Sequence, residues 1–206
     1  MVNYNGTLLQ DSDALLSPFN RGLHYGDTVF EVIRATTGKV LFWEDHYFRL
    51  MAAMRIMRME IPDSFTPEHL EEQLLKTLPK NDPHKTYALK ILVWRSEGGN
   101  YTPTGKTVGY LIFPQPLASP FYTIDNLFYE VELFKDHYVA TGLLATVKHS
   151  NRAVNVLAGI FAKENGYANC LLLNEKKQVV GALNGNIFLV NGHKIKTPPL
   201  ADGCIN

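Results

Sequence analysis

The chain has 206 residues, of which 46% are hydrophobic, and its 20 lysines and arginines are balanced by 20 aspartates and glutamates. That length allows one large domain or two small ones with a buried core, and the neutral balance gives no electrostatic case for binding nucleic acid or an anionic membrane. With two cysteines, no apolar stretch near the roughly 20 residues that span a bilayer and no secretory leader before the first strand-like run, we expect a cytoplasmic protein with reduced thiols.

The first half of the chain predicts strand pairs mixed with helices. Alternating apolar residues around Asn-Gly or Thr-Gly indicate strands, and apolar residues every three to four positions indicate helices. In chain order we expect a strand pair in 2–9, a hairpin in 27–43, helices in 44–59 and 65–79, and strands at 87–95 and 107–113 on either side of a Gly-rich loop.

A proline-rich stretch divides the chain. Residues 114–120, "PQPLASP", are expected to break any regular element and to link two domains, 1–116 and 117–206. After it we expect a strand in 121–134, an amphipathic helix in the second half of 146–166, and strands at 169–174, 178–180, 186–190 and 193–197. Helices and strands do not alternate regularly, which predicts an α+β or irregular α/β fold.

One lysine stands at a chemically unusual place. Lys148 follows the apolar, strand-like run 142–147 and precedes the amphipathic helix. Desolvation at the end of a buried strand lowers a lysine pKa from about 10.4, and a neutral amine is a nucleophile that forms Schiff bases with aldehydes. A lysine in this position is more often only the first charge after a buried strand, and this stretch by itself leaves both interpretations open.

Other segments carry similar ambiguity. Tyr25 lies between Gly22 and Gly26, just ahead of the hairpin. Arg49 lies near the start of a helix, where a guanidinium and the helix dipole together suit a phosphate, although most helix arginines are simply solvated. Arg95 ends an apolar strand before the Gly-rich loop, which suits either a carboxylate clamp or an ordinary strand edge.

Taken in order, these segments resemble the class IV aminotransferase family of pyridoxal-phosphate enzymes. That group includes branched-chain aminotransferases, D-amino-acid aminotransferases and aminodeoxychorismate lyases, and the match covers essentially the whole chain. The patterns that carry it are "RG-x-x-x-GD-x-VFE-x-x-R" at 21–34, "H-x-x-R" at His46 and Arg49, "K-x-x-NR" at 148–152, "N-x-F-x-V" at 186–190 and "KTPPL" at 196–200. The Lys-His-x-Asn-Arg pattern that begins at Lys148 is most similar to the lyase branch.

The resemblance implies a fold and a cofactor. It implies a two-domain fold-type IV enzyme with a small N-terminal α/β domain and a larger C-terminal domain, normally a homodimer. Lys148 would carry pyridoxal 5'-phosphate as a Schiff base and shuttle a proton. Arg49 would bind the phosphate, and Asn186 would belong to the cofactor side.

The resemblance also implies a substrate side. Tyr25, Arg34 and Arg95 become candidates for it, with Arg95 as the partner of a carboxylate. The substrate would be an amino acid or an amino-chorismate, and no metal site is predicted.

Three departures from the family keep alternatives open. Ala153 stands where branched-chain aminotransferases usually have tyrosine, and Gly181 stands where the family has a glutamate, five residues before Asn186. The family also continues beyond the position of Asn206, so we expect an incompletely covered second domain. An aminotransferase is the first hypothesis, an aminodeoxychorismate lyase is an alternative, and a truncated or degenerate non-catalytic homologue is another.

Overall fold

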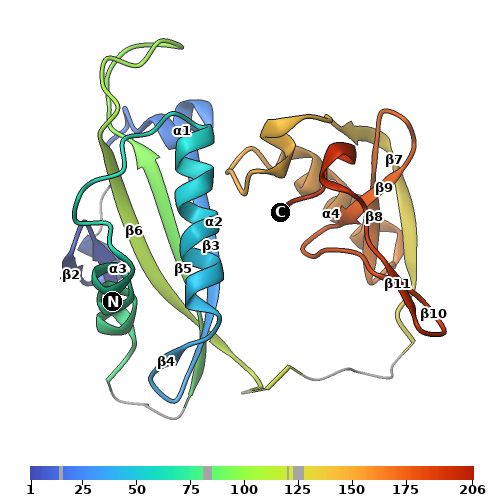
Figure 1. Ribbon diagram of the computed structural model, residues 1–206, viewed down its shortest axis with the longest axis horizontal. Helices are drawn as coiled ribbons and strands as arrows, with labels where there is room; N and C mark the ends of the chain where they lie inside the picture. The colour runs from blue at the N-terminus through green and yellow to red at the C-terminus, as the bar shows by residue number, and fades with distance from the viewer. Residues whose placement is uncertain (14–15, 81–84, 120, 123–127) are drawn as a thin grey trace. The chain divides into compact units, whose positions relative to one another are not determined.

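The chain folds into two compact units, Met1–Ile124 and Asp125–Asn206 (Figure 1). The computed structural model describes residues 1–13, 16–80, 85–119, 121–122 and 128–206. Both units mix helices with strands, so the predicted α+β class is confirmed.

Unit 1 is built on a six-stranded antiparallel sheet with strand order β2-β1-β6-β5-β3-β4. Helices α2 and α3 contact each other and pack on one face of that sheet (Figure 1). The strands are β1 Val2–Tyr4, β2 Thr7–Leu9, β3 Thr28–Thr36, β4 Lys39–Val40, β5 Thr86–Arg95 and β6 Val108–Leu117, and the helices are α1 Arg21–Tyr25, α2 Trp43–Ile56 and α3 Pro67–Thr77.

Strand β3 shows why this sheet forms. Val29, Glu31, Ile33 and Ala35 alternate along it and are at most 1% exposed, whereas Val32 between them is 37% exposed. Side chains at every second position of a strand lie on one face, so this row forms the face under the helices. The row includes a carboxylate, Glu31, which must therefore find a partner within the core.

The prediction that residues 114–120 break every regular element is wrong for its first part. Strand β6 continues through Pro114 and Pro116 to Leu117, paired with β5 over its whole length. Its other neighbour, β1, pairs only with Leu111 and Ile112, so β6 is an edge strand beyond that point. Proline is tolerated there because an edge needs no N–H donor on its open side.

Unit 2 holds a three-stranded sheet of order β7-β8-β9 and a separate β10-β11 hairpin. Strands β7 and β8 are parallel and are joined through α4, which packs on both, because a parallel pair needs a long crossover. The elements are β7 Val131–Val139, α4 Ala153–Asn165, β8 Asn169–Asn174, β9 Val179–Ala182, β10 Leu189–Asn191 and β11 Lys194–Lys196. The core comprises Phe134, Ala158, Ala162, Cys170, Leu172, Val180 and Cys204.

Two expectations for unit 2 need correction. The run before Lys148 is a 3-10 helix, Leu143–Thr146, and not a buried strand. Gly142, just before this helix, adopts φ 111°, and Leu143 is 67% exposed. The apolar residues of this run are therefore not a sign that it is buried. The strand expected in 121–134 begins only at Val131 within the described residues and continues to Val139.

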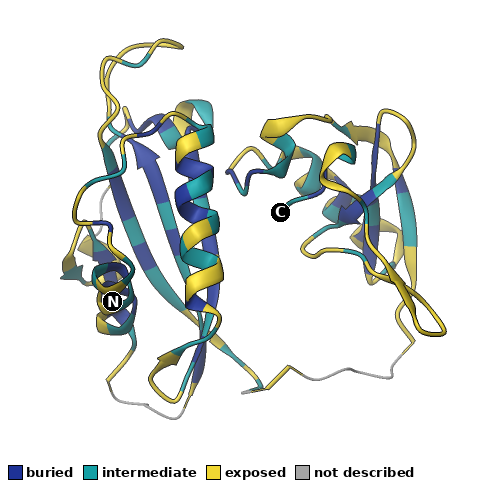
Figure 2. Ribbon diagram, in the orientation of Figure 1, coloured by how far each residue is buried: buried dark blue, intermediate teal, exposed yellow. Residues whose placement is uncertain are grey.

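Unit 2 also leaves apolar side chains in solvent. Phe188, Leu189, Val190 and Ile195, in and beside the β10-β11 hairpin, are each more than 60% exposed (Figure 2). An exposed apolar surface of this kind is typical of association sites. Among the described helices, none has the length and apolar character needed to cross a membrane.

Candidate active site

Arg49 lies on α2 directly above the buried carboxylate of β3. Its Nε and Nη2 donate to the two oxygens of Glu31 at 2.6 and 2.7 Å, and His46 Nδ1 lies 2.9 Å from Glu31 Oε2. The hydrogen bond to Glu31 raises the pKa of Arg49, so the guanidinium stays charged. A bidentate pair fixes the plane of the guanidinium. Arg49 is therefore an oriented, half-buried cation and not a solvated helix arginine.

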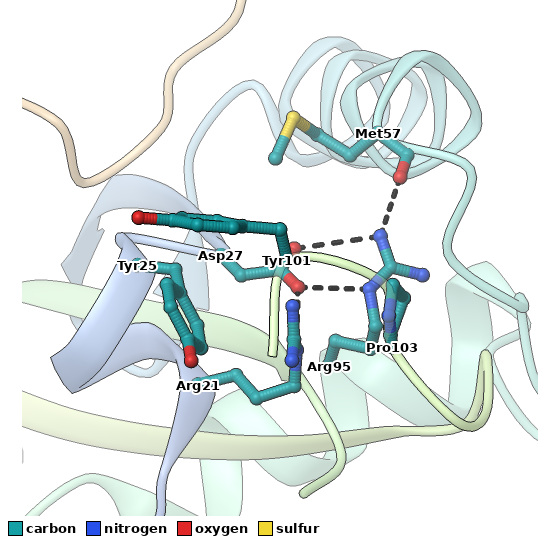
Figure 3. A pocket seen from close by; sticks show the side chains of 7 residues that line it. All are labelled: Arg21, Tyr25, Asp27, Met57, Arg95, Tyr101 and Pro103. Atoms are coloured by element: carbon teal, nitrogen blue, oxygen red, sulfur yellow. Dashed lines mark hydrogen bonds and ion pairs between the residues drawn. The ribbon is translucent and has the colours of Figure 1, made fainter. Parts of the chain in front are cut away.

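Arg95 is part of a second buried ion cluster, shown in Figure 3. Its Nε donates to Asp27 Oδ2 at 2.8 Å, its Nη2 to the Met57 carbonyl at 2.6 Å and its Nη1 to the Arg58 carbonyl at 3.0 Å. Arg95 is 6% exposed. The strand-end arginine thus binds Asp27 and the carbonyls at the end of α2, and each guanidinium nitrogen already donates to an internal acceptor.

The same aspartate binds Arg21, which sequence reasoning missed. Arg21 Nε donates to Asp27 Oδ2 at 3.0 Å, and both residues are less than 10% exposed. The available signal was their place as the arginine and the aspartate of the "RG-x-x-x-GD" pattern. Their pairing could not be read from spacing alone, because Arg95, the third member, lies 68 positions beyond Asp27.

Tyr25 borders a hollow beside this cluster. Gly26, at φ 61°, ends α1 after Tyr25, and the Tyr25 ring centroid lies 5.7 Å from that of Tyr101. The hollow has a volume of about 260 Å³, and Arg21 and Arg95 also line it (Figure 3). The structure therefore brings two predicted site residues, Tyr25 and Arg95, to one place.

Arg34, the third candidate for the substrate side, is engaged elsewhere. It belongs to β3, and its Nη1 donates to the Ser119 carbonyl at 2.8 Å. Its guanidinium also lies 4.2 Å from the Tyr122 ring centroid. It is not among the residues that line the hollow beside Tyr25.

In unit 2, Lys148 lies in a short segment between the 3-10 helix and α4. Lys148 itself is partly buried, and its neighbours Val147 and His149 are buried. Arg152 donates to the carbonyls of both neighbours, each at 3.0 Å. The backbone on either side of Lys148 is thereby held by one guanidinium.

His149 adds an unusual neighbour. Burial, together with the positive charge of Arg152, lowers the pKa of His149 to about 4. Its Nδ1 accepts a hydrogen bond from the Asn151 backbone N–H at 3.1 Å. Near neutral pH the residue beside Lys148 is therefore an uncharged imidazole.

Asn186 lies in a second hollow, of about 310 Å³, in unit 2. Asn186 is exposed and precedes β10, and Thr197, Cys204 and Asn206 contribute to the same lining. The Asn206 backbone N–H donates to the Thr146 carbonyl at 3.2 Å, which ties this lining to the segment just before Lys148.

Comparison with known proteins places this arrangement in a class. The "Amino-transferase class IV" family profile matches residues 28–206. The chain is 31% identical over 97% of its length to a putative branched-chain-amino-acid aminotransferase of Methanocaldococcus jannaschii, of which it covers 68%. It is 34% identical over its whole length to an aminodeoxychorismate lyase of Bacillus subtilis, of which it covers 70%.

Solved structures agree on the fold. A branched-chain aminotransferase of Escherichia coli matches 99% of this chain and 69% of its own with a TM-score of 0.82 at 21% identity. The pyridoxal-phosphate form of a branched-chain aminotransferase of Thermobaculum terrenum matches 99% of this chain and 68% of its own, with a TM-score of 0.82 and also at 21% identity. The chain thus has the N-terminal part of the fold of the fold-type IV pyridoxal-phosphate enzymes. It belongs to the class IV aminotransferase family, and the predicted enzyme class and cofactor are confirmed.

The chemistry of two side chains, one in each unit, suits pyridoxal phosphate. The Lys148 amine suits its aldehyde, and the oriented Arg49 guanidinium suits its phosphate. Gly181 in β9 offers no group to the ring nitrogen, although there is space: a Cβ built there would have only the Gly185 carbonyl oxygen nearby, at 3.5 Å. The nearby Asn184 accepts a hydrogen bond from Asn169, 3.2 Å away, and carries no charge.

Proposed function

We propose that this protein is a pyridoxal-phosphate-dependent aminotransferase that acts on an amino acid, with Lys148 as the residue that holds the cofactor. The observation that supports this most is the setting of Lys148. It is a partly buried lysine between two buried residues whose carbonyls are bound by Arg152. A fixed backbone can aim the amine, which a nucleophile in this chemistry requires.

The residues of this chain would have two kinds of role, binding of the cofactor and transfer of a proton. When bound, pyridoxal phosphate supplies a ring that withdraws electrons from the α-carbon of the substrate. Lys148 Nζ would hold the cofactor and then take and return the proton at the α-carbon. Arg49 would bind the phosphate while Glu31 keeps its guanidinium oriented. Asn186 would belong to the cofactor side.

On the substrate side we propose Tyr25 and Arg34, with a changed role for Arg95. The Arg95 guanidinium donates to Asp27 and to two carbonyls beyond the last residues of α2, so its geometry favours support of the hollow over direct binding of a carboxylate. Tyr25 keeps an aromatic ring at the hollow and remains the better candidate for contact with the substrate.

The aminodeoxychorismate lyase alternative has its own support. Two of the relatives are lyases, from Vibrio harveyi and Bacillus subtilis. The segment from Lys148 to Arg152 is similar to that branch, and Ala153 replaces the tyrosine usual in branched-chain aminotransferases. A degenerate, non-catalytic homologue stays a third possibility because of Gly181.

We also propose a cytoplasmic homodimer. The family resemblance supports both points, and the exposed apolar side chains around β10 and β11 support association.

A product assay separates these hypotheses. The full chain is loaded with pyridoxal phosphate and given a panel of D- and L-amino acids, each with and without a keto acid, and in parallel aminodeoxychorismate alone. An aminotransferase converts an amino acid only when the keto acid is present. Pyruvate released from aminodeoxychorismate without a keto acid would make it a lyase, and no turnover in any arm would make it non-catalytic.

A further inference from the structure

Three successive carbonyl groups in the loop that follows β5 accept hydrogen bonds from one guanidinium nitrogen. Arg21 Nη1 donates to the carbonyl oxygens of Gly98, Gly99 and Asn100 at 3.1, 3.1 and 2.7 Å. Three successive carbonyls can converge on one point only in a tight turn. Gly98 and Gly99 make that turn possible, since they adopt φ of 112° and 73°, which other residues rarely reach.

The cost of burying the charges of this cluster is offset by groups within unit 1. Arg21 and Arg95 share the single carboxylate of Asp27, which leaves one excess positive charge in a buried place. Five carbonyl oxygens face these guanidiniums, and two of them, from Met57 and Arg58, lie at the negative end of α2. Hydrogen bonds from charged donors to carbonyls offset the cost of burial, so the cluster needs no external anion.

The turn carries Tyr101 to the hollow. Tyr101 is 91% exposed, so little besides the turn and the neighbouring aromatic ring holds it in place. It lies 5.7 Å from the Tyr25 ring, and that ring lies 4.8 Å from Arg21 Cζ. One guanidinium therefore contacts both the turn before Tyr101 and the aromatic partner of Tyr101 (Figure 3).

We infer that Arg21 is a positioning residue, which fixes the turn 98–100 and thereby sets Tyr101 against Tyr25 as a wall that selects substrate side chains. The fixing of the turn follows from the geometry of unit 1 alone. The selection of substrate rests on the proposed function.

Amide hydrogen exchange of the full chain tests whether Arg21 fixes the turn, and the measurement does not require enzymatic activity. Arg21→Lys keeps the charge, but one ammonium nitrogen cannot occupy both the Nε position at Asp27 and the Nη1 position at the carbonyls. We expect amide exchange across 96–104 to speed up at least about tenfold, the effect of losing one charge-assisted hydrogen bond, while β5 keeps its rates. Arg55→Lys, at an exposed arginine on α2, is the matched control and should change nothing.

Gly99→Ala perturbs the same turn from the other side, in case Arg21→Lys does not fold. A Cβ there would collide with the Thr102 carbonyl oxygen while Arg21 stays intact. The same local acceleration is expected. Unchanged exchange in 96–104 in both variants, or an equal rise throughout β3 and β5, would overturn the inference. So would slower loop exchange in the unmodified chain on adding inorganic phosphate, since that would make the hollow an anion site.

The substrate arm uses Tyr101→Ala, which leaves Arg21 and the turn in place. We expect the kcat/KM ratio between an aromatic and a small aliphatic amino donor to change at least about fivefold, mainly through KM. Arg21→Lys should shift this ratio in the same direction. An unchanged ratio in both variants would remove the role in selection and leave the exchange result standing, whereas absence of turnover in the unmodified chain would count against the proposed function.

Discussion

The two units bury their charged groups in different ways. In unit 1, guanidiniums pair with carboxylates inside the fold, as Arg49 does with Glu31 and as Arg95 does with Asp27. In unit 2, the guanidinium beside the candidate lysine, Arg152, is held by backbone carbonyls. Ion pairs between side chains thus join separate elements of unit 1. In unit 2, Arg152 fixes a short length of backbone around Lys148.

The helix-covered sheet face of unit 1 and the β10-β11 hairpin of unit 2 differ as well, although unit 1 also exposes apolar side chains such as Phe19 and Phe42. In unit 1, Val29 and Ile33 on the helix-covered face of the sheet are fully buried, whereas in unit 2 Val190 and Ile195 of the β10-β11 hairpin are more than 60% exposed. The comparison suggests that unit 1 supplies a rigid framework. Unit 2 would supply the reactive amine and an apolar surface for association.

The largest expected effect is that of Lys148→Ala. Turnover of the cofactor-loaded protein should fall by orders of magnitude, because both the attachment point and the proton acceptor at the α-carbon are lost. Lys163→Ala, at an exposed lysine of α4, is a matched control and should leave turnover unchanged. Near-normal turnover in Lys148→Ala would show that Lys148 does not supply the amine.

Arg49→Ala tests the framework role of unit 1. Cofactor affinity should fall by one to two decades, since a charge-assisted hydrogen bond is worth roughly 1.5–3 kcal/mol. Stability should fall too, because the variant removes the guanidinium that pairs with both oxygens of the buried Glu31 carboxylate. Titration of bound cofactor and thermal unfolding measure the two effects, with Arg55→Ala on the exposed side of α2 as control. Unchanged affinity would leave the Arg49–Glu31 pair a purely structural one.

Gly181→Glu tests whether unit 2 lacks a catalytic group. If a carboxylate at this place keeps the ring nitrogen protonated, the substitution should speed removal of the substrate α-proton at least about tenfold. Exchange of α-deuterium into solvent, followed by NMR, measures this. Gly181→Gln has the same size without the charge and should give no acceleration. A flat or slower rate in Gly181→Glu would mean that another group serves the ring.

His149 predicts a pH-dependent effect on the stability of unit 2. Its pKa is lowered to about 4 in the folded protein against 6.5 as its ordinary value, so the unfolded chain binds the proton more readily between these values. The resulting stability is complete above pH 6.5 and falls as the pH drops toward 4, by about 3 kcal/mol at most. Urea unfolding at pH 7 and pH 4.5 should show this loss, and His149→Gln should reduce it. The same loss in the variant would assign it to carboxylates.

The sequence predicts some elements at the residues where the structure has them and misplaces others. Strand β8 occupies the residues expected for it, 169–174, because a short apolar run between polar turns has few alternatives. The run before Lys148 was misassigned because Gly142 redirects the chain and leaves Leu143 and Leu144 in solvent. The spacing of apolar residues in a sequence cannot show that the chain changes direction at a glycine.

The ion clusters lay beyond sequence reasoning for a different reason. Arg49 and Glu31 are 18 positions apart, and Asp27 and Arg95 are 68 apart. Such pairs exist only once the sheet register and the helix placement are set. The sequence could therefore nominate Arg49 and Arg95, and it could not say that both are already bound to carboxylates.

The central claim is that Lys148 holds the cofactor, and reductive trapping tests it most directly. The full chain is incubated with pyridoxal phosphate, reduced with borohydride, digested and mapped by mass spectrometry. We expect a single major phosphopyridoxyl modification on Lys148 that is absent from Lys148→Ala. A modification spread over surface lysines, or concentrated on another lysine, would contradict it.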